Sequence, residues 1–335
     1  MAVITLKHIC EQAGVSKATV SRVLNNHPLG SKETREKVQE VIKRLNFTPN
    51  ALARNLSLQK TDSIGVIFPW IFSGFFSTVL LGIDLAAREF GYHIITSLFH
   101  NQESESDNAW NLLQERRIDG LILMGPSLPM EKLRELKSRN LPFVVLQQEI
   151  PDKEISFVSV DNFDGGLKAA THLIERGYRR ILAVAGPENS QDSNRREEGF
   201  REALKKAGIK FDSSMLIRSD FNKESAIPNF ELYRQQFPMP EAIFCFNDDI
   251  ALGMLKFFRT IKVRVPEDVA VIGFDGIEFT DFAELSTVVT PMKQMGEQAT
   301  RLLIKQIENK KEPISEQWLL KGTVVARNST LRPGK

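Results

Sequence analysis

The sequence predicts a small all-α helix-turn-helix head followed by an α/β core of two doubly wound subdomains. Residues 5–45 show only helical apolar spacing, with capping residues between the helices. After residue 62, short β-rich runs alternate with amphipathic helices. The alternation repeats too often for one open sheet, so we expect two α/β subdomains.

These patterns also predict the domain boundaries. We expect a helix-turn-helix domain over residues 1–47, a hinge helix and linker over 48–61, and a core over 62–335. Within the core, an N-subdomain is expected over residues 62–164 and 291–320, and a C-subdomain over 165–290 and 321–331.

The first helix is predicted from apolar residues spaced i, i+3, i+4 and i+7, which are Leu6, Ile9, Cys10 and Ala13. Gly14 ends it. Ser16 suits the N-cap of a second helix, Lys17 to Leu24, and so tight a turn between two helices predicts a helix-turn-helix.

A third helix follows a loop formed by Asn25, Asn26, His27 and Pro28. Ser31 is its expected cap, and its inward face carries Val38, Val41, Ile42 and Leu45. The next segment, from Asn46 to Asp62, is interpreted as a linker that can form a short helix around Asn50 to Leu56.

The core is predicted element by element. Strands are expected over residues 64–68, 93–97, 120–124, 143–146, 157–160, 181–185, 242–246, 269–274 and 323–326. Helices are expected over residues 77–90, 108–116, 166–176, 195–207, 248–259 and 293–308. Such alternation favours parallel sheets covered on both faces.

Charge is distributed unevenly along the chain of 335 residues, although its net value is only +2. Residues 1–60 hold ten Lys/Arg and four acidic residues, a net of +6; the other 275 residues have a net of −4. A basic head on a slightly acidic body suggests that the head alone meets a polyanion.

Two features bear on the cellular compartment. Cys10 and Cys245 are too few for a disulfide framework, and the N-terminal residues lack the apolar region of a signal peptide, so we expect a reducing cytoplasm. Ile64 to Ile83 carry no charge, but Pro69 and Ser73-Gly74 interrupt them. A buried strand, a turn and a buried helix explain this stretch better than a membrane span.

The second helix carries residues suited to DNA. The outward residues are Lys17, Ala18, Ser21 and Arg22, on the helix that would enter the major groove. Arg22 can contact guanine bidentately, and the methyl group of Ala18 can pack on thymine. Ser16, Ser21 and Asn25 suit phosphate contacts. A helical packing domain with solvated basic residues fits this pattern alone about as well.

The motifs resolve that ambiguity. The runs TLKHICEQAGVSKATVSRVLNN and SKETREKVQEVIKRLNFTPNALARNLS closely resemble the head of the lactose-repressor family. The match covers about twenty positions in fifty residues. It implies base reading by Lys17, Ala18 and Arg22, and a hinge helix from Pro49 to Leu56 that orders on DNA. Leu56 matches a leucine that wedges into the minor groove and bends the duplex.

The resemblance also implies a homodimer on a palindromic operator, in the cytoplasm at the bacterial nucleoid. The DNA-binding residues expected on this basis are Thr5, Leu6, Ser16, Lys17, Ala18, Thr19, Ser21, Arg22, Asn25, Ser31, Asn50, Ala53, Arg54 and Leu56. The chain has no C-terminal heptad extension, so a tetramer built through a helical bundle is not expected.

Residues 62–330 resemble the effector core of that family, which has the fold of periplasmic sugar-binding proteins. The resemblance implies a small-molecule effector, a sugar or sugar derivative, between two subdomains joined by three crossovers. The expected effector-binding residues are Phe75, Phe76, Asp161, Asp164, Arg196, Asn247, Asp248, Asp275 and Thr290. Arginine, asparagine and aspartate together suit vicinal hydroxyls.

These assignments leave alternatives open. Phe75 and Phe76 can instead be core residues, Leu56 an ordinary linker leucine, and one of Asp161 and Asp164 a simple helix cap. Arg195 is expected to be solvated. The chain departs from the family at Ser73-Gly74, Gln147-Gln148 and Thr290-Pro291, which weakens any choice of effector.

Other function classes are less consistent with the sequence. No GxGxxG, GK[ST], GxSxG or HExxH motif occurs, and the five histidines lack metal-ligand spacing, so neither an enzyme nor a metal or cofactor site is expected. A solute-binding protein without a regulatory role would not need the basic head. A regulator that takes a non-sugar ligand as co-repressor remains the alternative to a sugar-induced repressor.

Overall fold

The computed structural model describes residues 5–24, 31–47, 60–69, 73–99, 115, 117–125, 128–309 and 314–331. The chain forms two compact units, Met1–Thr61 and Asp62–Lys335, each with its own apolar core. The first unit is all-helical, and the second contains two six-stranded sheets. The predicted fold class is therefore confirmed.

The described residues of the head contain three helices, α1 (Leu6–Ala13), α2 (Lys17–Leu24) and α3 (Lys32–Arg44). The expected caps are present: Gly14 after α1 has a φ of 65°, Ser16 accepts from the Thr19 amide at 3.2 Å, and Ser31 accepts from the Thr34 amide at 3.2 Å. Apolar residues from all three helices close a small core, comprising Ile9, Ala13, Val20, Val23, Val38 and Val41.

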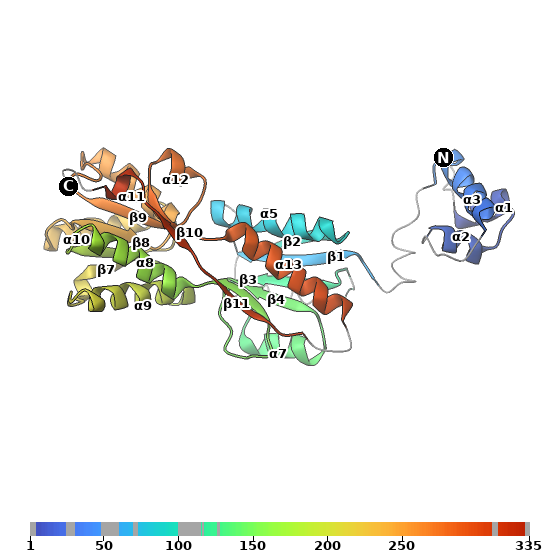
Figure 1. The fold of residues 1–335 in the computed structure, drawn as a ribbon, viewed down its shortest axis with the longest axis horizontal. Helices are drawn as coiled ribbons and strands as arrows, with labels where there is room; N and C mark the ends of the chain where they lie inside the picture. The colour runs from blue at the N-terminus through green and yellow to red at the C-terminus, as the bar shows by residue number, and fades with distance from the viewer. Residues whose placement is uncertain are drawn as a thin grey trace. The chain divides into compact units, whose positions relative to one another are not determined.

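The second unit alternates strands and helices (Figure 1). Its strands are β1 (Ser63–Pro69), β2 (His93–Phe99), β3 (Gly120–Met124), β4 (Phe143–Leu146), β5 (Phe157–Val160), β6 (Ile181–Ala185), β7 (Leu216–Arg218), β8 (Ala242–Cys245), β9 (Ala270–Asp275), β10 (Ser286–Val289), β11 (Gln317–Leu320) and β12 (Thr323–Val325). Its α-helices are α5 (Gly74–Glu89), α7 (Met130–Ser138), α8 (Asn162–Glu175), α9 (Gln191–Lys206), α10 (Ala226–Gln236), α11 (Asp248–Thr260), α12 (Phe279–Phe282) and α13 (Met292–Glu308).

Two sheets organise these elements, in the orders β11-β5-β4-β3-β1-β2 and β12-β10-β9-β8-β6-β7. All pairs are parallel except β10–β12. The chain passes between the sheets three times, after β5, after β10 and after β11. The carboxyl ends of parallel strands form one edge of a sheet, where ligands of such folds bind.

Alternating residues of each strand face opposite layers. In the first sheet, Val66 and Ile122 face the layer of α5 and α13, which lie side by side (Figure 1). Leu121 and Leu123 face the layer of α7. The second sheet is covered in the same way by α8 and α9 on one face and by α10 and α11 on the other. Both sheets are therefore buried on both faces, which explains their near-continuous apolar strands.

Three helices begin earlier than their apolar periodicity predicts. α5 begins at 74 rather than 77, α8 at 162 rather than 166, and α9 at 191 rather than 195. The first turn of α9 is polar and that of α8 carries one large apolar residue, Phe163, so no apolar stripe marks them, whereas α5 begins at Gly74, which was expected to interrupt the chain. For α8 and α9 the start is set by side-chain caps, Asp161 and Ser190, which accept hydrogen bonds from the amides three residues on.

Six short elements were not expected from the sequence: β7, β10, β11, α7, α10 and α12. β7 and β11 are edge strands with partly exposed residues, so they lack a buried apolar run. As expected, a strand and a helix lie in the stretch from Ile64 to Ile83, since β1 ends at Pro69 and α5 begins at Gly74; residues 70–72 lie outside the described residues. In the described part of the chain, no helix is long and apolar enough to cross a membrane. Most of the helix expected over 108–116 lies outside the described residues.

Candidate DNA-binding and effector-binding sites

The helix-turn-helix presents a row of exposed side chains on α2. Lys17, Ala18 and Arg22 are exposed, whereas Val20 and Val23 on the other face are buried. Ser16 and Thr19 bond to each other through their hydroxyls at 2.9 Å, which holds the start of the helix. The geometry leaves the predicted base-reading face open to a partner.

The other predicted DNA contacts of the head differ among themselves. Thr5 caps α1, and its backbone amide donates to His8 Nδ1 at 3.1 Å. Leu6 is half-buried against the core of the head, so packing already accounts for it. Ser21 is half-buried, and Ser31 is exposed at the start of α3. The remaining predicted contacts, Asn25, Asn50, Ala53, Arg54 and Leu56, lie outside the described residues.

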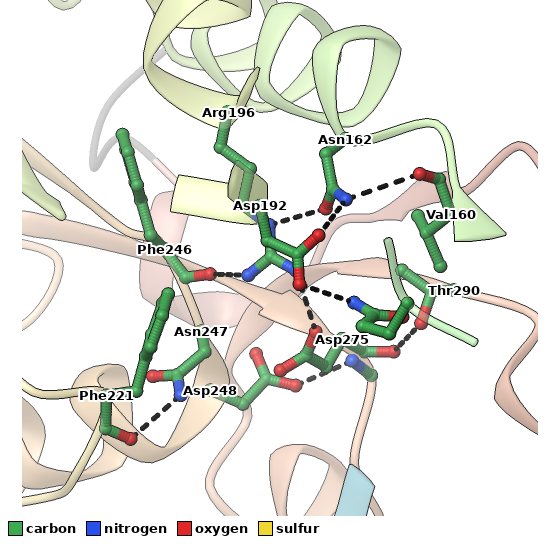
Figure 2. A network of polar contacts seen from close by, with 12 residues as sticks. Val160, Asn162, Asp192, Arg196, Phe221, Phe246, Asn247, Asp248, Asp275 and Thr290 are labelled. Carbon is green, nitrogen blue, oxygen red and sulfur yellow. Dashed lines mark hydrogen bonds and ion pairs between the residues drawn. The ribbon is translucent and has the colours of Figure 1, made fainter. Parts of the chain in front are cut away.

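Arg196 is the centre of a buried polar network in the second unit. Only 3% of its surface is exposed, and its guanidinium lies over the Phe274 ring at 3.8 Å from the ring centre. Its Nε donates to Asn162 Oδ1 at 2.8 Å, and its Nη1 donates to the Phe246 carbonyl. Figure 2 shows the side chain pointing into the network beside Asn162 and Asp192. Nη2 lies 3.6 Å from Asp275 Oδ1.

Two close helix contacts hold Arg196 there. A Cβ at Gly199 would lie 2.2 Å from the Phe163 carbonyl oxygen, and a Cβ at Gly166 would lie 2.3 Å from the Arg196 carbonyl oxygen. Glycines at these two positions let α8 and α9 approach closely. Gly199, three residues after Arg196 on α9, therefore serves the packing that positions the arginine.

Asp275, at the end of β9, faces the guanidinium. Its backbone carbonyl accepts from the Thr290 amide at 2.9 Å and from the Thr290 hydroxyl at 3.1 Å. The side chain is 7% exposed. Burial raises the pKa of Asp275 well above its ordinary value, although Arg196 lowers it, and Asp248 raises it further.

Asp248 and Asn247 follow β8. Asn247 caps α11 by accepting from the Ile250 amide at 2.8 Å, and its Nδ2 donates to the Phe221 carbonyl at 2.9 Å (Figure 2). Asp248 has no exposed surface. It accepts from the Thr287 hydroxyl and the Gly276 amide, both at 2.6 Å. Burial raises the pKa of Asp248 to about 7, against the lowering effect of these hydrogen bonds.

Asp192 joins the two sheets. It lies one turn before Arg196 on α9 and accepts from Asn162 Nδ2 at 2.8 Å. Its other oxygen accepts from Gln147 Nε2 at 3.0 Å, and Gln147 follows β4 in the first sheet. Burial raises the pKa of Asp192, although Arg196 lowers it.

Next to this contact, α9 and the segment after β4 form a clasp made of Glu149, Gln191 and Arg195. The Glu149 amide donates to Gln191 Oε1 at 2.7 Å, and Gln191 Nε2 donates back to the Glu149 carbonyl at 3.0 Å. Arg195 Nε lies 3.2 Å from Glu149 Oε1, and Arg195 also pairs with Glu198 at 2.5 Å. The expectation that Arg195 is merely solvated is therefore wrong.

Several residues of the network around Arg196 have a strained backbone. Of the eight non-glycine residues with positive φ in the described segments, Gln147 (60°), Phe221 (59°) and Asp275 (113°) belong to this network. Four of the others directly follow or lie just past helices, where a left-handed residue is common. Bulky residues in this region are strained and cluster at functional sites.

The other predicted effector residues, Asp161, Asp164, Phe75 and Phe76, contact local partners. Asp161 caps α8 by accepting from the Asp164 amide at 2.9 Å, and Asp164 pairs with Lys168 at 2.6 Å. Phe75 is buried in the main apolar cluster, and its ring packs edge to face on Phe76 at 5.4 Å. The structure thus brings together Arg196, Asn247, Asp248, Asp275 and Thr290.

The sequence interpretation missed three members of the network, Gln147, Asn162 and Asp192, as site residues. Asp192 is four residues before Arg196, a spacing that places both on one helix face. Gln147 and Asn162 follow the ends of parallel strands. Those two positional signals could have found them.

Comparison with known proteins decides the family. Residues 5–50 match the family described as bacterial regulatory proteins, lacI family, and residues 170–330 match the periplasmic binding protein-like domain. The HTH-type transcriptional repressor CytR of Escherichia coli strain K12 is 33% identical over 307 residues, 91% of this chain and 90% of that protein. The chain belongs to the lacI family.

Other relatives agree with this membership. The HTH-type transcriptional repressor PurR of Photorhabdus laumondii is 33% identical over 312 residues, 92% of each chain. The lac repressor dimer bound to operator and the anti-inducer ONPF superposes with a TM-score of 0.88 at 26% identity, covering 98% of this chain and 100% of that one. The chain is a DNA-binding transcriptional repressor of this family and, like its relatives, not an enzyme.

Two similar solved structures hold sugars. The transcriptional regulator CelR in complex with cellobiose has a TM-score of 0.74 at 30% identity, covering 97% of this chain and 99% of that one. A LacI-family regulator from Enterococcus faecium with bound ribose has a TM-score of 0.72 at 28% identity, covering 82% of this chain and 100% of that one.

Proposed function

We propose that this repressor binds a palindromic operator as a homodimer and is controlled by a small-molecule effector, a sugar or sugar derivative, bound between the two sheets. The observation that carries the proposal is the strained, buried network around Arg196 and Asp275. Such a network, with members from both sheets, can couple a ligand to the angle between the subdomains. The planar donors and acceptors of Arg196, Asn247 and Asp275 suit a polyhydroxylated ligand.

In the helix-turn-helix, α2 enters the major groove of the operator. Lys17, Ala18 and Arg22 read base edges, while Ser16 and Ser21 contact phosphates and position the helix. The segment 48–61 orders on DNA as a hinge, and Leu56 enters the minor groove. Ligand binding changes the spacing of the two hinges in the dimer and releases the operator, so the effector is an inducer. The repressor acts in the cytoplasm, on genes of carbohydrate use.

Exposed apolar side chains of the core support the homodimer. Leu81 and Leu85 lie four residues apart on α5 and are 51% and 42% exposed. Phe279 and Phe282 of α12 are 59% and 81% exposed. Apolar surface of this kind marks an interface, and a second copy supplies the same patches by two-fold symmetry.

The experiment combines operator selection with effector screening on the full chain. A palindromic duplex is selected from a randomised library, and its affinity is measured by fluorescence anisotropy while sugars, sugar acids and nucleobases are added singly. We expect nanomolar specific binding that falls steeply with salt, and a loss of affinity with one class of added compound. An effector that instead tightens operator binding would make the chain co-repressor-dependent. The absence of any specific duplex would refute the proposal.

A further inference from the structure

The network around Arg196 contains more acidic groups than basic ones. Asp192 and Asp275 face Arg196, and Asp248 lies beside Asp275, so among the described residues the network holds three carboxyls and one cation. The other cations nearby already have partners: Arg195 pairs with Glu149 and Glu198, Arg218 with Glu197, and Lys223 with Asp249. With all three aspartates ionised, the network has an excess of two negative charges.

Arg196 has little capacity left for a ligand anion. Its Nε donates to Asn162 and its Nη1 donates to the Phe246 carbonyl, while Nη2 lies beside Asp275. Two of the five guanidinium N–H groups are not used by these partners, but a phosphate or carboxylate that accepts from them would lie against the three aspartates. Desolvating an anion beside like charges is strongly unfavourable.

One hydrogen-bond acceptor in the network lacks a partner. Gln147 is 9% exposed, and its Nε2 is used by Asp192. Its Oε1 is buried without a hydrogen-bond partner among the described residues. The backbone at Gln147 has a φ of 60°, a strained conformation for a non-glycine residue that the surrounding structure must hold. A buried unsatisfied carbonyl is unfavourable and calls for a donor.

The titration behaviour agrees with this geometry. Burial raises the pKa of Asp192, Asp248 and Asp275, and the lowering effects of Arg196 and of the hydrogen bonds only partly oppose it. Burial therefore disfavours the ionised form of all three carboxyls. A ligand that brings N–H or O–H groups would supply them with donors.

We propose that the effector is an uncharged or cationic molecule that presents several N–H or O–H donors to Asp192, Gln147 and Asp275, and that its phosphorylated or carboxylated forms are excluded. This rests on the proposed function and names the ligand class of that site.

The test uses matched probes on the full chain at pH 7.5. Melting temperatures are measured with D-glucose, D-glucosamine and glucose 6-phosphate, with D-ribose and ribose 5-phosphate, with cytidine and its 5′-monophosphate, and with inorganic phosphate alone. We expect a rise of at least about 2 °C from an uncharged or aminated member of a set, and none from its phosphorylated partner. A phosphorylated probe that raises the melting temperature more than its uncharged counterpart overturns the proposal.

A second arm needs no ligand. Asp192→Asn removes one negative charge and keeps one of the two acceptor oxygens that Gln147 and Asn162 use. Because the folded protein disfavours the ionised form, the variant should melt higher than the parent at pH 8, and this gain should shrink toward pH 4. Asp275→Asn makes the same test at the carboxyl end of β9.

Asp268→Asn is the matched control. Asp268 pairs with Arg264 at 2.7 Å, which holds the pKa of that carboxyl at about 2, so this variant should lose melting temperature at pH 8. If Asp192→Asn and Asp275→Asn behave like Asp268→Asn, the network has no acidic excess and the proposal is wrong. Failure of the proposed function appears in a different readout, as operator affinity that no probe changes.

Discussion

The three-helix head and the buried network around Arg196 hold their polar side chains in opposite ways. On α2, Lys17 and Arg22 are exposed, and the helix is held by ordinary caps. In the core, Arg196 and Asp275 are almost fully buried, and three nearby residues adopt positive φ. A surface that contacts DNA requires only a helix in the right place. A network that couples ligand binding to a conformational change requires buried polar groups and strained backbone that the fold holds in position.

The largest expected effect comes from removing the central cation of the network. Arg196→Ala leaves Asp275 and Asp192 without their positive neighbour and should destabilise the chain by about 3–5 kcal/mol. Chemical unfolding measures this loss. The double variant Arg196→Ala/Asp275→Asn should recover part of it, and a purely additive result would break the inferred coupling.

The head should respond differently, because its side chains are exposed. Arg22→Ala is expected to weaken binding to the selected operator by about 1–3 kcal/mol per half-site, with little change in the free energy of unfolding. Anisotropy titrations at fixed salt measure the affinity. Lys43→Ala, which removes an exposed charge from the last turn of α3, is the control. If both variants lose the same operator affinity, Arg22 contributes only its charge and makes no specific base contact.

The clasp of Glu149, Gln191 and Arg195 connects α9 to the segment after β4, and one substitution removes its hydrogen bonds to the backbone. Gln191→Ala removes two hydrogen bonds to the backbone of Glu149 and should cost about 1 kcal/mol. It should also speed hydrogen exchange at the Glu149 amide. Asn229→Ala removes a similar bond to the Arg218 carbonyl, 2.9 Å long and within one subdomain. The control should lose stability without changing that exchange rate.

The smallest expected effect lies at the C-terminal end of the described chain, where His172 contacts the Thr330 hydroxyl at 2.9 Å. Burial, with help from Arg176, lowers the pKa of His172 to about 4. The unfolded chain therefore takes up a proton first, and stability falls as the pH drops from about 6.5 to about 4. The loss should be roughly 1 kcal/mol or less, since solvent screens this half-buried ring.

Thermal melts from pH 8 to pH 4 check this effect against His172→Asn, which should lack it. Asp192 and Asp275 act in the opposite direction, because their raised pKa values lower stability as the pH rises. An acid loss of equal size in the His172→Asn variant would show that other groups cause it.

The sequence predicted the bodies of the core helices better than their first turns. Apolar periodicity placed the bodies of α8 and α9 but missed their polar first turns. Those turns hold Asn162, Gln191 and Asp192, which are the residues that connect the network to the first sheet. Polar starts of helices contribute nothing to an apolar stripe, and this is also where such folds place ligand contacts.

The sequence alone determined the family, the helix-turn-helix, the fold class and the residues Arg196, Asn247, Asp248 and Asp275, because these depend on local motifs and on strand ends. Only the tertiary structure decided which polar groups meet. Gln147 follows β4 and Asp192 lies on α9, 45 residues further along the chain, yet their side chains bond at 3.0 Å. The burial that raises the pKa of Asp192 arises only when these distant segments meet, and no local pattern encodes that contact.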